Sequence, residues 1–261
     1  MTPQNKKTSL TDLLNLYGRW LPPLSIVLAV VVWQLVAQFG GLPSFILPSP
    51  WQVATRFVTA LADGSLLKHS LVTFNEVILG LVAGCFLATF AGYWLARSRV
   101  LENTLSPYLV ASQAVPVVAI APLLIIWFGP GMFSKVLICA LMVFFPVLVN
   151  TVVGLRAVPE NLGDLMRSLK ATRMQTLIYL QVPAALPVFL GGLRVGATLS
   201  VIGATVGEFV GADQGLGFLI NVGRGQYDTA LVFVAIFSLI IMALALYGLV
   251  VLTERISLRW Q

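Results

Sequence analysis

Residues 229–253 read TALVFVAIFSLIIMALALYGLVVLT, and this run contains no charged side chain. A helix needs about 20 mostly apolar residues to cross the hydrocarbon core of a bilayer, so the run is long enough for one crossing. The whole chain has the same character, since 58% of its 261 residues are hydrophobic and 10% are charged. Soluble domains carry roughly a quarter charged residues. The sequence therefore predicts an all-α integral membrane protein.

Five further stretches have the length and polarity of membrane-spanning helices. Together with the first run they predict six spans, at residues 21–39, 71–96, 105–128, 133–155, 184–212 and 229–252. Residues 1–20 are polar and form an N-terminal segment, while residues 21–261 form one transmembrane domain. After the first span we expect an external loop and then a short interfacial helix from Trp51 to Leu61, where apolar residues recur at helical spacing.

The distribution of basic residues predicts the orientation of the chain. With the N-terminus inside, eleven bases fall on the inner side: Lys6, Lys7, Arg19, Arg97, Arg99, Arg156, Arg167, Lys170, Arg173, Arg255 and Arg259. Four fall on the outer side: Arg56, Lys68, Lys135 and Arg224. Positive residues favour the cytoplasmic side, so both termini are expected to be cytoplasmic in the cell membrane of a prokaryote.

Several function classes fit the composition poorly. The net charge of +6 comes from short tracts between apolar runs and not from a basic stripe, so nucleic acid is not an expected partner. The only histidine is His69, and Cys85 and Cys139 lie inside apolar runs, so neither a metal site nor a disulfide is expected. No G-x-x-x-x-G-K-[ST] phosphate-binding loop is present.

The segment between the fourth and fifth spans, residues 156–183, reads RAVPENLGDLMRSLKATRMQTLIYLQVP. Four apolar residues in it have the spacing of one helical face: Leu162, Leu165, Met166 and Leu169. Thr172 and Gln175 form a T-x-x-Q capping box, which predicts a second short helix from Arg173. Pro183 is expected to stop or kink that helix. From the residues alone, the segment is either a solvated connector or a docking knob for a cytoplasmic partner.

The same segment resembles the "EAA" loop of permease subunits in ABC importers. Asp164 lies at the glutamate position of that motif, Leu165 and Met166 lie at its two alanine positions, and Lys170 replaces its glycine. Leu180, Val182 and Pro183 lie at its I, L and P positions. The resemblance assigns ATPase coupling to residues of this loop: Asp164, Leu165, Met166, Arg167, Lys170, Ala171, Thr172 and Pro183.

Other segments extend the resemblance over nearly the whole chain. They are Leu47-Pro48-Ser49-Pro50, Trp127-Phe128-Gly129, Phe145-Pro146, Gly154 to Pro159 and Pro183 to Pro187. Together they are similar to the permease branch that serves sulfonates, taurine, nitrate and vitamin-like compounds. The run Leu165–Ala171 and the run Val201–Ala212 look closest to permeases for riboflavin and for the pyrimidine precursor of thiamine.

The resemblance implies the fold and partners of a type I ABC importer. Two identical permease copies would form the pathway in the lipid membrane, and an extracytoplasmic binding protein would deliver the solute. A pair of cytoplasmic ATPase subunits would grip the 156–183 loops. ATP and magnesium would bind to that ATPase, so this chain is expected to be neither an enzyme nor the carrier of a cofactor.

Polar groups inside the predicted spans are candidates for the translocation pathway. Glu208 lies deep in the fifth span. It is either on or near the solute path or the outer gate, or a carboxylate bonded within the bundle near the outer interface. Gln113, Pro116 and Pro122 interrupt the third span, which either lines the pore or is merely kinked. Asn150 is a weaker candidate in the fourth span.

Two more charged residues and a group of small ones have structural interpretations. Glu76 is expected at the outer membrane interface, and Arg194 is expected to extend toward the cytoplasm. Small residues in the fifth span favour close helix packing: Gly191, Gly192, Gly196, Ala197, Ser200, Gly203 and Ala204.

Three other functions remain as alternatives. An ion-coupled secondary transporter often has matched halves and several carboxylates within the membrane, whereas this chain has no visible repeat and one deep carboxylate. A membrane-embedded enzyme needs a convergent set of catalytic side chains, for which one histidine and few acids leave little material. A channel would not need the structured cytoplasmic loop.

Overall fold

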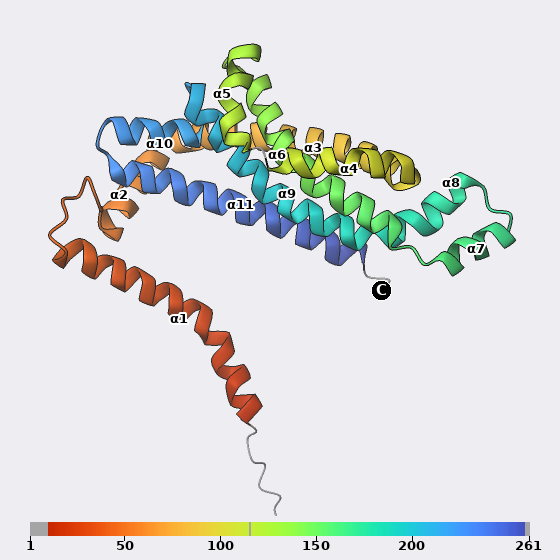
Figure 1. Cartoon of the computed structure of the whole chain (residues 1–261). Helices are drawn as coiled ribbons and strands as arrows, with labels where there is room; N and C mark the ends of the chain where they lie inside the picture. Colours follow the sequence, from red (N-terminus) through yellow and green to blue (C-terminus); the bar gives the residue numbers. More distant parts are fainter. Residues whose placement is uncertain (1–9, 115, 259–261) are drawn as a thin grey trace, which may run out of the picture.

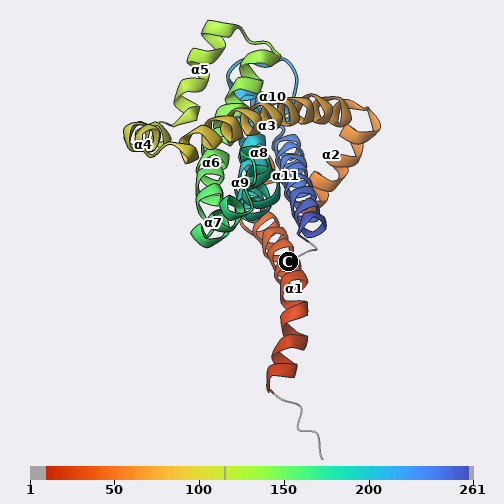
Figure 2. The ribbon, with the colours of Figure 1, turned by 90° about the vertical axis from the view of Figure 1, so that its right-hand side faces the viewer.

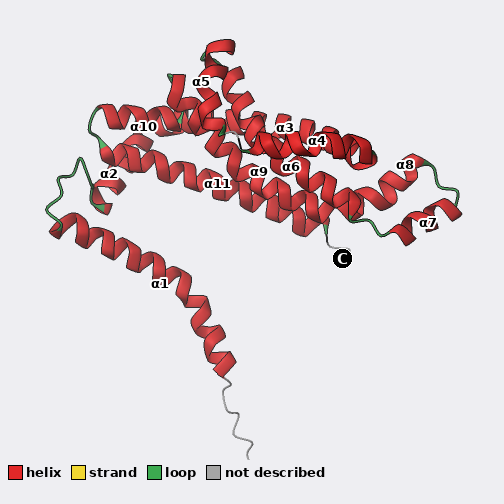
Figure 3. Ribbon diagram, in the orientation of Figure 1, coloured by secondary structure: helices red, strands yellow, loops and turns green. Residues whose placement is uncertain are grey.

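The computed structural model describes residues 10–114 and 116–258, and every regular element in these residues is a helix (Figures 1 and 3), as the composition predicts. In chain order the helices are α1 (Leu10–Phe39), α2 (Pro50–Ala62), α3 (Ser65–Arg97), α4 (Arg99–Gln113), α5 (Val117–Phe128), α6 (Met132–Arg156), α7 (Glu160–Ser168), α8 (Arg173–Thr176), the π-helix η1 (Leu177–Gln181), α9 (Val182–Gly211), α10 (Leu216–Gly225) and α11 (Thr229–Ser257).

Three long helices form the centre of the molecule. Helix α6 packs along both α3 and α9, which also contact each other, and α11 packs against α9. Helices α7 and α8 project from one end of this bundle, whereas α2 and α10 lie at the other end (Figure 1). Helix α1 leaves the bundle and points away from it in both views (Figures 1 and 2).

Within residues 10–114 and 116–258, four helical segments are long and apolar enough to cross a membrane. They are α3, α6, the continuous helix from Arg173 to Gly211, and α11. Two shorter apolar helices, Pro23–Phe39 and Val117–Phe128, fall where the first and third spans are expected. The count of six spans and the cytoplasmic placement of both termini stay predictions.

The third expected span is not one helix. Instead of a continuous segment over 105–128, α4 ends at Gln113 and α5 begins at Val117. Pro116 precedes α5 with an extended backbone (φ −69°, ψ 114°). A proline lacks the N–H that would continue the preceding helix and disfavours helical geometry in the residue before it, which explains why the helix breaks here.

Close contact between α3 and α6 depends on small residues along one face of α3. Gly80, Gly84, Ala88 and Gly92 recur every four residues and are all buried. A Cβ atom on Gly84 would lie 2.6 Å from the carbonyl oxygen of Ala140 and 2.9 Å from the Cβ of Val143. The two backbones therefore approach more closely than larger residues would allow.

Helix α6 also meets small residues of α9, as the sequence predicts. Gly192, Gly196 and Gly203 face Asn150, Val143 and Cys139 of α6, respectively. Gly191 differs from these three, since a Cβ atom there would meet no other atom within 4 Å. The prediction of close packing is thus confirmed for this part of α9, but not for every small residue in it.

We predict that Gly84→Ala lowers the free energy of unfolding by about 1–3 kcal/mol, because the backbone of α6 has to move to admit the methyl group. Gly191→Ala is the control, and it should leave stability unchanged or raise it by up to about 1 kcal/mol, since alanine suits a helix better than glycine. Thermal unfolding of the two purified variants in detergent tests this. Equal midpoints would contradict the packing argument.

Candidate functional site

The loop at residues 156–183 forms two short helices joined by a tight turn. Helix α7 ends at Ser168, and Lys170 then adopts a left-handed conformation with φ of +53°. Thr172 caps α8, because its hydroxyl accepts the Gln175 N–H at 3.2 Å while the Gln175 side chain accepts the Thr172 N–H at 2.8 Å. The capping box read from the sequence is confirmed.

The helix that begins at Arg173 continues without interruption into the bundle. Pro183, expected to stop or kink it, does not stop it, because α8 passes through the π-helical turn η1 into α9, and Figure 1 shows α8 inclined to α9 near this point. Since proline cannot donate an N–H to the preceding turn, the wider π-helical turn just before it accommodates the missing bond. The result is one helical segment of 39 residues, Arg173–Gly211.

The surface of α7 is largely free of contacts with the rest of the chain. Leu165 and Leu169 are 52% and 68% exposed, and Leu162 is exposed as well. The carboxylate of Asp164 forms an ion pair with Arg167 at 2.9 Å, and both side chains face solvent. An exposed pair of this kind contributes little to stability. Both the apolar face and the charged tip are therefore available to a partner.

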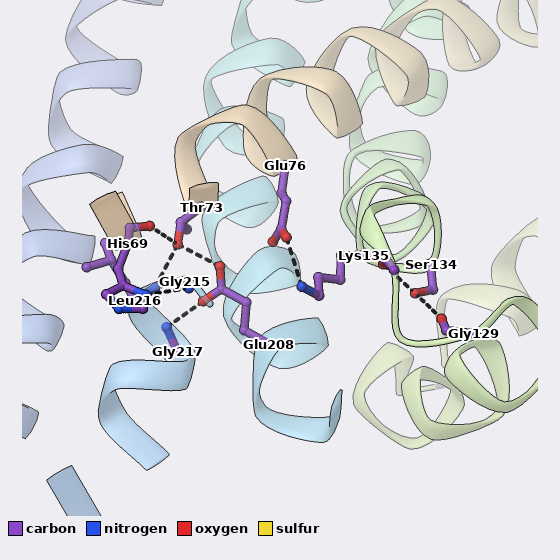
Figure 4. A network of polar contacts seen from close by, with 11 residues as sticks. His69, Thr73, Glu76, Gly129, Ser134, Lys135, Glu208, Gly215, Leu216 and Gly217 are labelled. Carbon is purple, nitrogen blue, oxygen red and sulfur yellow. Dashed lines mark hydrogen bonds and ion pairs between the residues drawn. The ribbon is translucent and has the colours of Figure 1, made fainter. Parts of the chain in front are cut away.

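A second group of polar side chains is buried at the other end of the bundle (Figure 4). Lys135 of α6 extends its ammonium group to within 3.1 Å of Glu76 on α3, and both side chains are almost fully buried. The carboxylate of Glu76 lies inside the protein, and its expected position at the outer membrane interface stays a prediction.

Glu208 bonds within the bundle, which is one of the two roles open to it from sequence. Its carboxylate accepts the Thr73 hydroxyl of α3 at 2.6 Å and the backbone N–H of Gly217 in α10. Thr73 in turn accepts the N–H of Leu216 at 2.8 Å, and His69 Nδ1 accepts the N–H of Gly215 at 3.0 Å. Glu208 thus joins three helices, as Figure 4 shows.

The other pathway candidates do not gather around Glu208. The side chain of Asn150 donates to the carbonyl of Pro146 in its own helix at 2.8 Å and packs against Gly192. Gly192 and Glu208 are sixteen residues apart on α9, which is roughly 24 Å at 1.5 Å per residue. Pro116 is exposed at the start of α5, and the side chain of Gln113 lies outside the described part of the chain. A pathway role for these residues stays a prediction.

Two further ion pairs connect helices at opposite ends of the bundle. Arg194 of α9 pairs with Glu254 near the end of α11, and its expected extension toward the cytoplasm stays a prediction. At the other end, the Nε of Arg56 on α2 donates to Asp228 at 2.8 Å, and both side chains are about 30% exposed. Asp228 also caps α11 by accepting the Leu231 N–H.

Sequence reasoning missed three members of the buried group: His69, Thr73 and Lys135. The sequence did contain a sign that Lys135 is buried. It is the only charged residue between residues 103 and 155, and it directly precedes an apolar run. A lysine in that position needs a carboxylate partner inside the membrane. Thr73 and His69 carried no comparable signal, because their partners are backbone N–H groups more than 140 residues away.

Comparison with known proteins gives consistent findings. The sequence profile of the family described as "Binding-protein-dependent transport system inner membrane component" matches residues 80–257. The chain is 48% identical to a riboflavin transport system permease of Chloroflexus aurantiacus, over 92% of this chain and 89% of that protein. It is 35% identical to a formylaminopyrimidine transport permease of Halalkalibacterium halodurans, over 92% and 95%.

The fold also matches a solved structure. A chain of the methionine ABC transporter MetNI, in an inward-facing conformation, superimposes with a TM-score of 0.65 over 74% of this chain and 96% of that chain, at 18% sequence identity. The expected importer permease fold is therefore confirmed at the level of architecture.

The two ion pairs at the α2–α10 end allow a matched prediction about stability. Lys135→Met should lower the free energy of unfolding by about 3–5 kcal/mol, because it leaves a buried carboxylate without its counter-charge. Arg56→Gln should cost about 1 kcal/mol or less, since that pair is partly solvated. Adding Glu76→Gln to Lys135→Met should recover part of the loss. Denaturant titration in mixed micelles measures all three, and equal losses for the two single variants would contradict the assignment.

Proposed function

Because the chain belongs to the family of inner membrane components of binding-protein-dependent transport systems, we propose that it imports riboflavin or a related heteroaromatic vitamin precursor. Membership of the family makes the chain a multi-pass permease subunit of an ABC importer in the cell membrane, and not itself an enzyme. The solute, the stoichiometry and the functional residues are our proposals.

The observation that carries the proposed solute is the 48% identity to a riboflavin permease over 92% of the chain. A second relative is named for formylaminopyrimidine, and both named solutes contain a pyrimidine-type ring. The alternative solutes are sulfonates, taurine and nitrate, which the sequence resemblance also includes. An ion-coupled transporter is a less favoured alternative, because binding-protein-dependent importers use ATP.

We further propose that loop 156–183 is the contact with the ATPase, and we call it the coupling loop. Exposed leucines on α7 beside a mixed-charge tip form the kind of surface that binds another protein, since exposed apolar patches outside a membrane usually mark interaction sites. The continuous helix from Arg173 to Gly211 joins this surface rigidly to the bundle.

The proposed assembly has three kinds of partner. Two copies of this chain form the pathway, two cytoplasmic ATPase subunits bind ATP and magnesium below them, and an extracytoplasmic binding protein presents the solute. The family implies the ATPase and the binding protein. The pairing of two identical permeases is part of the proposal.

Uptake into proteoliposomes tests the solute. We expect the permease, reconstituted with its ATPase and its binding protein, to accumulate radiolabelled riboflavin only when ATP is supplied. The pyrimidine precursor of thiamine, taurine and nitrate serve as parallel solutes. Preferred uptake of taurine or nitrate would replace the proposed solute, and uptake driven by an ion gradient without the ATPase would refute the importer mechanism.

Charge reversal tests the coupling loop. Replacing Asp164 by Lys together with Arg167 and Lys170 by Glu should reduce ATP-dependent uptake at least about tenfold, because it inverts the charged tip that the ATPase contacts. Arg255→Glu, an exposed change at the end of α11 outside the loop, should have little effect. Co-purification of the ATPase with each variant completes the test. Unchanged uptake and co-purification in the triple variant would contradict the docking role.

A further inference from the structure

The start of α10 is held by side chains from other helices. The first N–H groups of a helix have no partner within it, and they are usually satisfied by a capping side chain. The residue before α10 is Gly215, which has no side chain to supply. Instead, His69, Thr73 and Glu208 accept the N–H groups of Gly215, Leu216 and Gly217, respectively. The position of α10 therefore depends directly on α3 and α9.

The fit around these bonds is close. Thr73 is fully buried and Glu208 is 1% exposed. A Cβ atom on Gly217 would lie 2.8 Å from Oε2 of Glu208, and one on Gly215 would overlap the same carboxylate. Gly215 also has a φ of +115°, a backbone conformation that residues other than glycine rarely adopt. Both glycines are needed for the carboxylate to reach the backbone.

Helix α10 does not move alone, because it packs into a larger unit. Its residues Leu216, Leu219 and Ile220 share one hydrophobic cluster with residues of α2, α3 and the first turns of α11. The ion pair between Arg56 and Asp228 connects α2 to the turn after α10. We call α2, α10 and the first two turns of α11 the rim. It lies at the end of the bundle opposite the coupling loop (Figure 1).

One continuous helix reaches from the coupling loop to the rim. The segment Arg173–Gly211 starts at the Thr172 cap, and its 39 residues correspond to about 58 Å at 1.5 Å per residue. Glu208 lies in its last turn. Coupling between distant sites is carried by rigid elements and the hydrogen bonds that link them, and here both are in place.

We propose that His69, Thr73 and Glu208 form a clamp through which α9 moves the rim, so that the rim follows the coupling loop during the transport cycle. In this role Glu208 is a positioning residue, because its carboxylate bonds to α3 and α10 and acts on solute only through the rim. The inference rests on the proposed function, since it takes the coupling loop as the point where the ATPase acts.

Thr73→Val is the central variant. Valine has nearly the same shape but removes the hydroxyl that joins Glu208 to Leu216. Thr89→Val is the matched control on the same helix, because the Thr89 hydroxyl contacts only the carbonyl and the thiol of Cys85, both within α3. Glu208→Ala and Glu208→Gln form a second pair, in which glutamine keeps an oxygen for the Gly217 N–H and alanine does not.

Hydrogen exchange in lipid nanodiscs reports directly on the clamp. In the full-length permease, Thr73→Val and Glu208→Ala should speed exchange of the amides at 215–217 about tenfold, whereas Thr89→Val should match the wild type. Glu208→Gln should lie between wild type and Glu208→Ala. Wild-type exchange in Thr73→Val and Glu208→Ala would overturn the inference, because α10 would then not depend on these side chains.

The complete transporter tests whether the clamp carries motion. With ATPase and binding protein present, Thr73→Val should keep the basal ATPase rate but lose about tenfold in riboflavin uptake per ATP and in stimulation by the binding protein. A merely structural defect would lower basal and stimulated rates together. Wild-type uptake per ATP in Thr73→Val would overturn the clamp and leave the importer intact, whereas no ATP-driven uptake by the wild type would refute the proposed function itself.

Discussion

A protein interior offers little water to a buried charge, so Glu76, Lys135 and Glu208 have to find their partners within the protein. This constraint decides how one end of the molecule is built. Lys135 joins α6 to α3, and Glu208 joins α9 to both α3 and α10. Each bond adds a directional contact between helices to the apolar packing that also joins them.

Close packing and buried charge act on different parts of the bundle. Along most of its length, α6 packs against small residues of α3 and α9, and glycines at the contact bring the backbones together. At the end where α10 lies, hydrogen bonds take over this role. The centre of the bundle therefore resists separation of its helices, whereas the α10 end specifies their register. A rigid centre with a defined register is what lets a displacement at one end appear at the other.

Local sequence patterns predicted most helices but not their partners. Apolar runs located the long helices, and the T-x-x-Q pattern located the start of α8. Each of these signals is formed by residues that are near neighbours in the sequence. The environment of Glu76 was not predicted, since α3 begins at Ser65 and not near Leu71, which places the carboxylate a further turn and a half inside the helix. The bonds of Thr73 and His69 join residues that are distant in sequence, so only the fold reveals them.

The two ends of the helix from Arg173 to Gly211 are built by opposite physical means. At the coupling loop the neighbouring side chains are exposed to solvent, and the ion pair between Asp164 and Arg167 is solvated and weak. Asp164 and Arg167 can therefore exchange this contact for contacts with a partner. At the other end Glu208 is buried, and exchanging its bonds would leave a charge unsatisfied in the bundle. When a partner displaces the exposed end of this helix, the buried end has to carry α10 with it, because Glu208 has no other contacts to which it can change.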